Sequence, residues 1–233
     1  HLTALSLVKN NITSHGILSL AKALSNSEIT SLRSLKLSQN KIGDRGVAAL
    51  SAVLHDTVLH TIELNNIGAG DIGAKHLALA LSVKRKRKNK MRPRLPTFPS
   101  LAYGENKLTP EGLLYFASCI VLNKSICSVY LDGNNSLGDQ ASTILSDLLQ
   151  CFTSLSELSV QNIGLTRAGV SKLLTACDGS DTLRTVHLGS NKLDDLQQMS
   201  ILASKFKIVH LKLEQIDASI TPESHGSKNT MLP

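Results

Sequence analysis

Hydrophobic residues along this chain follow a pattern whose period changes partway and then starts again. Leu35 and Leu37 alternate with polar residues, and a period of two is that of a β-strand. Farther on, Gly46, Leu50 and Leu54 recur every four residues, which keeps them on one face of an α-helix. This segment therefore predicts a short strand followed by a helix.

The same pattern recurs through most of the 233 residues. Written as L-x-x-L-x-L-x-x-N-x-I-x3-G-x3-L-x3-L, it begins at eight positions, the last copy being truncated: Leu2, Leu32, Leu59, Phe98, Ile126, Leu155, Leu183 and Ile208. One unit cannot bury its apolar face alone, whereas stacked units share a continuous core. The repeat therefore predicts an α/β solenoid over residues 1–216, curved like a horseshoe, with parallel strands on its concave face and helices on its convex face. Residues 217–233 are polar and predict a flexible tail.

Units of 27–30 residues with full helices resemble the ribonuclease-inhibitor-like class of leucine-rich repeats, and the resemblance covers residues 2–216. Turns of two kinds alternate along the chain, as at residues 12–13 and 42–44, which adds to the resemblance. The fifth unit departs from the pattern by one inserted residue, Asn135 or Ser136.

The net charge of +7 comes from one segment. Without the eight basic residues between positions 84 and 94, the chain has 17 basic residues against 18 acidic ones. Prolines at positions 93, 96 and 99 disfavour helix and strand, so we expect residues 82–97 to form a loop inserted between two units. The basic residues of this loop are Lys84, Arg85, Lys86, Arg87, Lys88, Lys90, Arg92 and Arg94.

Three interpretations of the basic loop stay open. It is a solvated insertion without a partner, a nuclear-localisation-like signal, or a docking segment for an acidic protein surface, RNA or lipid phosphate. No aromatic residue that could stack on bases lies among the basic residues of the loop. We therefore expect no nucleic-acid binding outside this loop.

The units around this loop also resemble Ran GTPase-activating proteins. The resemblance rests on residues 64–81, on the basic insertion after them and on the G-x-N-x-L turn at residues 104–108. In that family a turn asparagine helps to arrange the catalytic glutamine of the GTPase, and Asn40 matches its position. Three features depart from the family: Glu105 replaces a basic residue, the family's long acidic tail is absent, and the counterpart of its catalytic arginine would fall before His1.

Signatures of catalysis are missing from the sequence, which contains neither G-x-x-x-x-G-K-[ST] nor H-E-x-x-H nor G-x-S-x-G. His187 and His210 are expected on neighbouring strands, but two histidines make a poor metal site. We therefore expect no enzymatic activity, no cofactor and no metal. The four cysteines form no C-x-x-C pair, which indicates reduced thiols and a cytoplasmic or nuclear location. No apolar stretch is long enough to span a membrane, so no membrane contact is expected.

Side chains that flank the central apolar residue of each strand are expected to point to the concave face. Tyr130 is the first interface candidate, because aromatic residues often anchor protein interfaces. The full set of candidates is Lys36, Glu63, Tyr130, Asp132, Glu157, Gln161, His187 and Lys212. This polar face predicts a non-enzymatic protein-interaction module or scaffold within a larger intracellular protein, with other proteins, including subunits of a large assembly, as partners. Two alternatives stay open: a Ran-type activator of a small GTPase, with Asn40 contacting the GTPase, and a ligand-sensing repeat domain of an innate immune receptor.

Overall fold

The computed structural model describes residues 2–25, 31–84, 96–151, 154–192 and 210–212. They form one parallel sheet of eight strands, in which each strand pairs with its neighbours in the sequence. The strands are β1 (Ala4–Ser6), β2 (Ser34–Lys36), β3 (Thr61–Glu63), β4 (Ser100–Ala102), β5 (Ser128–Tyr130), β6 (Glu157–Ser159), β7 (Thr185–His187) and β8 (His210–Lys212).

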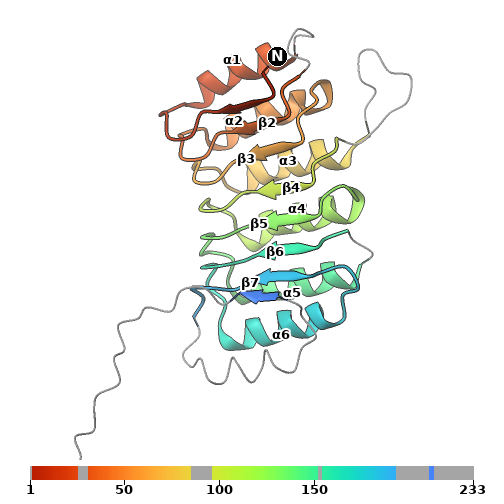
Figure 1. The fold of residues 1–233 in the computed structure, drawn as a ribbon. Helices are drawn as coiled ribbons and strands as arrows, with labels where there is room; N and C mark the ends of the chain where they lie inside the picture. Colours follow the sequence, from red (N-terminus) through yellow and green to blue (C-terminus); the bar gives the residue numbers. More distant parts are fainter. Residues whose placement is uncertain (1, 26–30, 85–95, 152–153, 193–209, 213–233) are drawn as a thin grey trace, which may run out of the picture.

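Helices alternate with the strands and cover one face of the sheet, as Figure 1 shows. The described helices are α1 (Ser14–Ser25), α2 (Gly43–Val53), the short 3-10 helix η1 (Leu54–Asp56), α3 (Asp71–Ser82), α4 (Pro110–Leu122), α5 (Gly138–Gln150) and α6 (Arg167–Asp178). Strands about 4.8 Å apart lie opposite helices that pack about 8–10 Å apart, so the strands line the concave face. The predicted α/β solenoid is confirmed. The predicted tail at residues 217–233 lies outside the described residues.

The core lies between the sheet and the helices, and the repeated aliphatic residues fill it. In the second unit, Leu32, Leu35, Leu37 and Leu50 are at most 2% exposed. Leu35 pairs in register with Ile62 on the next strand, so equivalent residues of successive units stack in one layer. The period read from the sequence thus places the leucines in a continuous core, as a solenoid requires.

A row of asparagines closes the turns after the strands. The carboxamide oxygen of Asn134 accepts hydrogen bonds from the N–H groups of Asn106 and Leu108, at 3.1 and 3.2 Å. Its Nδ2 donates to the carbonyls of Tyr103 and Leu131, at 2.9 and 2.8 Å. The side chain thus satisfies backbone groups of its own unit and of the unit before it. The asparagine row consists of Asn40, Asn106, Asn134 and Asn191.

Isoleucine replaces the row asparagine in two units, at Ile67 and Ile163, and both side chains are fully buried. Their own N–H groups are bonded by the row asparagines of the following units, Asn106 and Asn191. At these two positions a buried aliphatic side chain therefore replaces the hydrogen-bonding carboxamide of the row asparagine and adds to the core. The residue inserted in the fifth unit lies in an exposed turn, at positions 135–136.

Three aspartates in the first turns of helices bond the next unit. Asp71 in α3 accepts hydrogen bonds from the N–H and the hydroxyl of Thr109, at 2.9 and 2.6 Å. Asp139 in α5 does the same with Thr166, at 2.8 and 2.6 Å. Asp44 in α2 accepts from two N–H groups at the start of α3. Each carboxylate therefore satisfies N–H groups at the positive end of a neighbouring helix and ties two units together.

The repeated glycine of the pattern makes room for these carboxylates. A methyl group at Gly112 would collide with the carboxylate of Asp71, and one at Gly169 would collide with that of Asp139. The glycine of one unit is thus required by the aspartate of the unit before it.

The predicted basic loop falls between α3 and β4 in the sequence. Residues 85–95 lie outside the described residues, and so do seven of the eight basic residues predicted for the loop; Lys84 is described and exposed. Buried Asn123 donates from Nδ2 to the carbonyls of Leu81 and Pro96, at 2.8 and 3.0 Å. One side chain therefore holds the two ends of the insertion close together.

Candidate functional site

The concave face consists of the residues on either side of each strand's buried centre. In β5, Val129 is fully buried, whereas Ser128 and Tyr130 are half-buried. Parallel pairing in register places Tyr130 beside Ser159, and Ser159 beside His187. The sequence-predicted candidates on β5, β6 and β7 therefore share one face.

Glu157 is the centre of a hydrogen-bonded group on this face. One of its carboxylate oxygens accepts hydrogen bonds from the hydroxyls of Tyr130, at 2.8 Å, and Ser128, at 3.3 Å. The other oxygen lies 3.2 Å from Nε2 of His187. Because Tyr130 and His187 lie on the strands that flank β6, Glu157 joins three strands. We define the concave cluster as Tyr130, Asp132, Glu157, Ser159 and His187.

Asp132 bonds the neighbouring strand just beyond this group. Its Oδ1 accepts hydrogen bonds from the Ser159 hydroxyl, at 2.6 Å, and from the N–H of Gln161, at 2.8 Å. The Gln161 carboxamide lies 3.5 Å from the same hydroxyl. Within the described residues, the second carboxylate oxygen of Asp132 has no hydrogen-bond partner in the chain. This oxygen leaves the cluster with an acceptor for a ligand.

Partial burial fixes the protonation of the tyrosine. Burial raises the pKa of Tyr130 above its usual value, and the hydrogen bond to Glu157 raises it further. The phenol therefore stays protonated and donates to the carboxylate. The side chain of Glu157 is 31% exposed and that of His187 15%, so the cluster is ordered by its own bonds and still reaches solvent.

Two further candidates pair with each other away from this cluster. Lys36 on β2 and Glu63 on β3 form an ion pair of 2.7 Å. Ala102 on β4 separates Glu63 from Tyr130 in the register of the sheet. Exposed ion pairs of this kind contribute little to stability, so the Lys36–Glu63 pair is available for exchange with a ligand.

The register of β8 places Lys212 beside His187, and His210 beside Thr185. The expected neighbours His187 and His210 are therefore not paired with each other in the register. Among the described residues, no group of three or more His, Cys, Asp and Glu side chains is placed to hold a metal ion. The expected lack of a cofactor and of catalysis stays a prediction.

Two serines of this surface were not among the candidates predicted from the sequence. Ser128 bonds Glu157, and Ser159 bonds Asp132. Both flank the buried centre of their strands, which is the same signal that identified Tyr130. They were missed because small hydroxyl side chains carry no charge or ring that marks them as candidates.

Asn40, the candidate for contact with a GTPase, belongs to the asparagine row and is 5% exposed. Its Oδ1 accepts hydrogen bonds from the N–H groups of Asn10 and Ile12. Its Nδ2 donates to the carbonyls of Leu7 and Leu37. Every hydrogen-bonding atom of the side chain is thus occupied by backbone, which does not favour a contact with a partner.

The family model of the leucine-rich repeat matches residues 1–21 and 28–51. The chain is built of leucine-rich repeats. These repeats indicate a protein-interaction module. Among the described residues of this leucine-rich repeat chain, no helix is both long and apolar enough to cross a bilayer.

Three proteins similar to the chain are much longer than the part that matches. The mouse centrosomal protein of 78 kDa is 27% identical over 188 residues. The NACHT, LRR and PYD domains-containing protein 14 of mouse is 29% identical over 198 residues, and that of human is 27% identical over 216 residues. The matches cover 80–83% of this leucine-rich repeat chain and 18–22% of the relatives. The chain thus spans about a fifth of the length of these relatives.

Proposed function

We propose that this chain is a non-enzymatic recognition module of a larger protein, and that its concave cluster binds a partner protein. The observation that carries the proposal is the bonding of Glu157 to side chains from both flanking strands. These bonds fix the positions of polar groups that still reach solvent. The length of the relatives supports a module within a longer chain.

The chemistry of the cluster favours a partner that presents a basic side chain. The cluster holds two carboxylates: Glu157 accepts a hydrogen bond from the Tyr130 hydroxyl, and Asp132 accepts one from Ser159, the residue paired with Tyr130 in the register. A guanidinium or ammonium group pairs with carboxylates and also stacks on an aromatic face.

The setting we propose is the cytoplasm or the nucleus, with other proteins as partners, including subunits of a large assembly. All four cysteines are free thiols: Cys119 and Cys177 are buried, Cys127 is half-buried and Cys151 is exposed. Unpaired cysteines fit a reducing compartment, where disulfides are rare.

The test compares two charge reversals in the tagged parent protein, purified from its own cells and followed by mass spectrometry of the bound proteins. Glu157→Lys reverses the charge at the centre of the concave cluster. Asp181→Lys makes the same change at an exposed residue in the loop before β7. We expect at least one protein to be lost with Glu157→Lys and retained with Asp181→Lys.

Two results would contradict the proposal. Identical sets of bound proteins in the two variants, both with wild-type melting temperatures, would show that the concave cluster is not the binding surface. Recovery of a small GTPase that still binds Glu157→Lys, and whose single-turnover GTP hydrolysis is accelerated by the chain, would favour the Ran-type alternative instead.

A further inference from the structure

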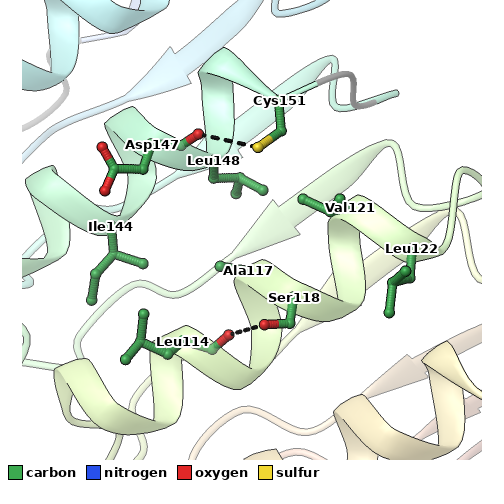
Figure 2. A pocket seen from close by; sticks show the side chains of 9 residues that line it. All are labelled: Leu114, Ala117, Ser118, Val121, Leu122, Ile144, Asp147, Leu148 and Cys151. Carbon is green, nitrogen blue, oxygen red and sulfur yellow. Dashed lines mark hydrogen bonds between the residues drawn. The ribbon is translucent and has the colours of Figure 1, made fainter.

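A groove of about 400 Å³ lies between α4 and α5, on the helix side of the sheet and away from the concave cluster. Figure 2 shows the two helices side by side, with side chains from both directed at the space between them. On α4, the exposed fractions of Leu114 and Leu122 are 53% and 58%, which is high for large apolar side chains. The groove is lined by Leu114, Ala117, Ser118, Val121, Leu122, Ile144, Asp147, Leu148 and Cys151.

The polar groups of the lining are largely occupied within their own helices. The Ser118 hydroxyl donates to the carbonyl of Leu114 at 2.9 Å, and the Cys151 thiol donates to the carbonyl of Asp147 at 3.4 Å, as the dashed lines in Figure 2 mark. Most of the groove wall is therefore carbon. The carboxylate of Asp147 is the one charged group of the lining.

The two helices that form the groove also differ from the others in charge. Neither α4 nor α5 contains a lysine or an arginine, whereas each of the other described α-helices contains at least one. Three acidic residues lie on α4 and α5, and the carboxylate of Asp139 is bonded to Thr166. The other two, Glu111 and Asp147, are exposed. Glu111 lies one turn before Leu114, so it shares the face of α4 that borders the groove.

We propose that this groove binds a basic amphipathic helix of a partner protein. The apolar face of that helix fills the groove, and its lysines or arginines pair with Glu111 and Asp147. Leu114 and Leu122 are eight residues apart, so the rim they form is about 12 Å long. This length accepts apolar side chains at positions i, i+4 and i+7 of a docked helix.

The neighbouring hollow on the same face lacks this combination of an apolar wall with acidic residues and no basic ones. The hollow between α5 and α6 includes Lys172, Gln150 and Thr175 in its lining, so a basic helix would meet a positive charge there. It therefore supplies a matched control: Ala117 borders the α4–α5 groove and Ala176 borders the α5–α6 hollow, and both are half-buried alanines.

The experiment measures fluorescence anisotropy of labelled synthetic peptides of about 16 residues, long enough to form a helix on binding. One peptide carries leucines at i, i+4 and i+7 with lysines and arginines on its polar face. A second carries glutamates in place of the basic residues, and a third has the basic composition in an order that destroys the apolar face. Each is titrated against the wild-type chain, Ala117→Phe, Ala176→Phe, Glu157→Lys and the double variant Glu111→Lys/Asp147→Lys.

We expect the basic amphipathic peptide alone to bind the wild-type chain. Ala117→Phe, which fills the groove, and the double charge reversal should each weaken it about ten-fold or more, while Ala176→Phe and Glu157→Lys leave it unchanged. The double reversal should also gain binding of the acidic peptide, a result that loss of folding cannot produce.

Three outcomes would overturn the proposal. The first is equal binding of basic and acidic peptides by the wild-type chain, and the second is equal loss with Ala117→Phe and Ala176→Phe. The third is a dimer of the chain in sedimentation that Ala117→Phe dissociates, because a second copy would then occupy the groove. Since Glu157→Lys tests the concave cluster separately, failure of one proposal leaves the other intact.

Discussion

The asparagine row and the concave cluster both consist of polar residues beside the strands, and they differ in what they bond. The row bonds backbone groups: Asn134 is fully buried and satisfies N–H and carbonyl groups of two successive units. The concave cluster bonds mainly side chain to side chain, and Glu157 at its centre is 31% exposed. A polar residue that satisfies buried N–H and carbonyl groups of the backbone is required for folding. One that is held in place by other side chains and reaches solvent is available for recognition.

The largest effect that this comparison predicts is that of Asn134→Ala. The substitution removes hydrogen bonds from two N–H groups and two carbonyls in a buried turn, and only the Tyr103 carbonyl keeps another side-chain donor, Nδ2 of Asn106 at 3.2 Å. Unsatisfied buried groups each cost about 1–3 kcal/mol, so we expect the free energy of unfolding to fall by about 3 kcal/mol in urea denaturation. Asn135→Ala, at the adjacent exposed position, should change it by less than about 0.5 kcal/mol. Equal losses of unfolding free energy at the two positions would show that the buried row asparagine contributes no more to stability than an exposed asparagine.

The aspartates that tie helices together should show a smaller effect of the same kind. Asp139→Ala removes the acceptor for the N–H and hydroxyl of Thr166, at the start of α6. We expect a loss of about 1–2 kcal/mol, as for other groups that cap a helix amino terminus. Asp181→Ala, in an exposed loop, serves as the control. A loss below that of the control would show that water replaces the carboxylate.

The difference between buried and exposed cysteines predicts how stability depends on pH and which thiols react. Burial raises the pKa of Cys119 and of Cys177 from 9.0 to about 12. Between these values the folded chain keeps two protons that the unfolded chain releases, so this contribution to stability is complete below pH 9 and is lost as the pH rises toward 12. At pH 8, iodoacetamide should label exposed Cys151 first, and the two buried thiols only on unfolding, as read by mass spectrometry. Equal labelling of all three would show that the core opens.

Tyr130→Phe should have a small effect on stability and a large one on binding. It removes one hydrogen bond of 2.8 Å from a half-exposed position, which costs about 1 kcal/mol or less in thermal or urea unfolding. The partner identified by purification should bind the variant more weakly, by titration of the purified proteins. A loss of stability as large as that of Asn134→Ala would instead place Tyr130 with the structural residues.

The smallest effect is expected for deletion of residues 84–94, the basic loop. Asn123 bonds the carbonyls at both ends of the insertion, so a shorter connection closes the same gap. We expect the melting temperature to change by less than about 2 °C, whereas Asn123→Ala in the same background should lower it by more. A large loss on deletion alone would mean that the loop packs against the solenoid.

Much of the candidate site was predictable, because the alternation along each strand assigns residues to a face. It placed Tyr130, Glu157 and His187 together on the concave side, and the register confirms that placement. The same alternation could have identified Ser128 and Ser159. The groove between α4 and α5 was not predictable, since it depends on how two helices of different units are spaced.

The sequence by itself determined the repeat, the alternation of strand and helix, and which residues face the core, because each follows from a local period. Only the tertiary structure decided which polar groups meet. Glu157 bonds Tyr130 and His187, which are 27 and 30 residues away, and Asp71 bonds a helix start 38 residues away. Such contacts depend on how closely and in what register the units stack. Stacking also left α4 and α5 with an open apolar groove, which no period within a single unit encodes.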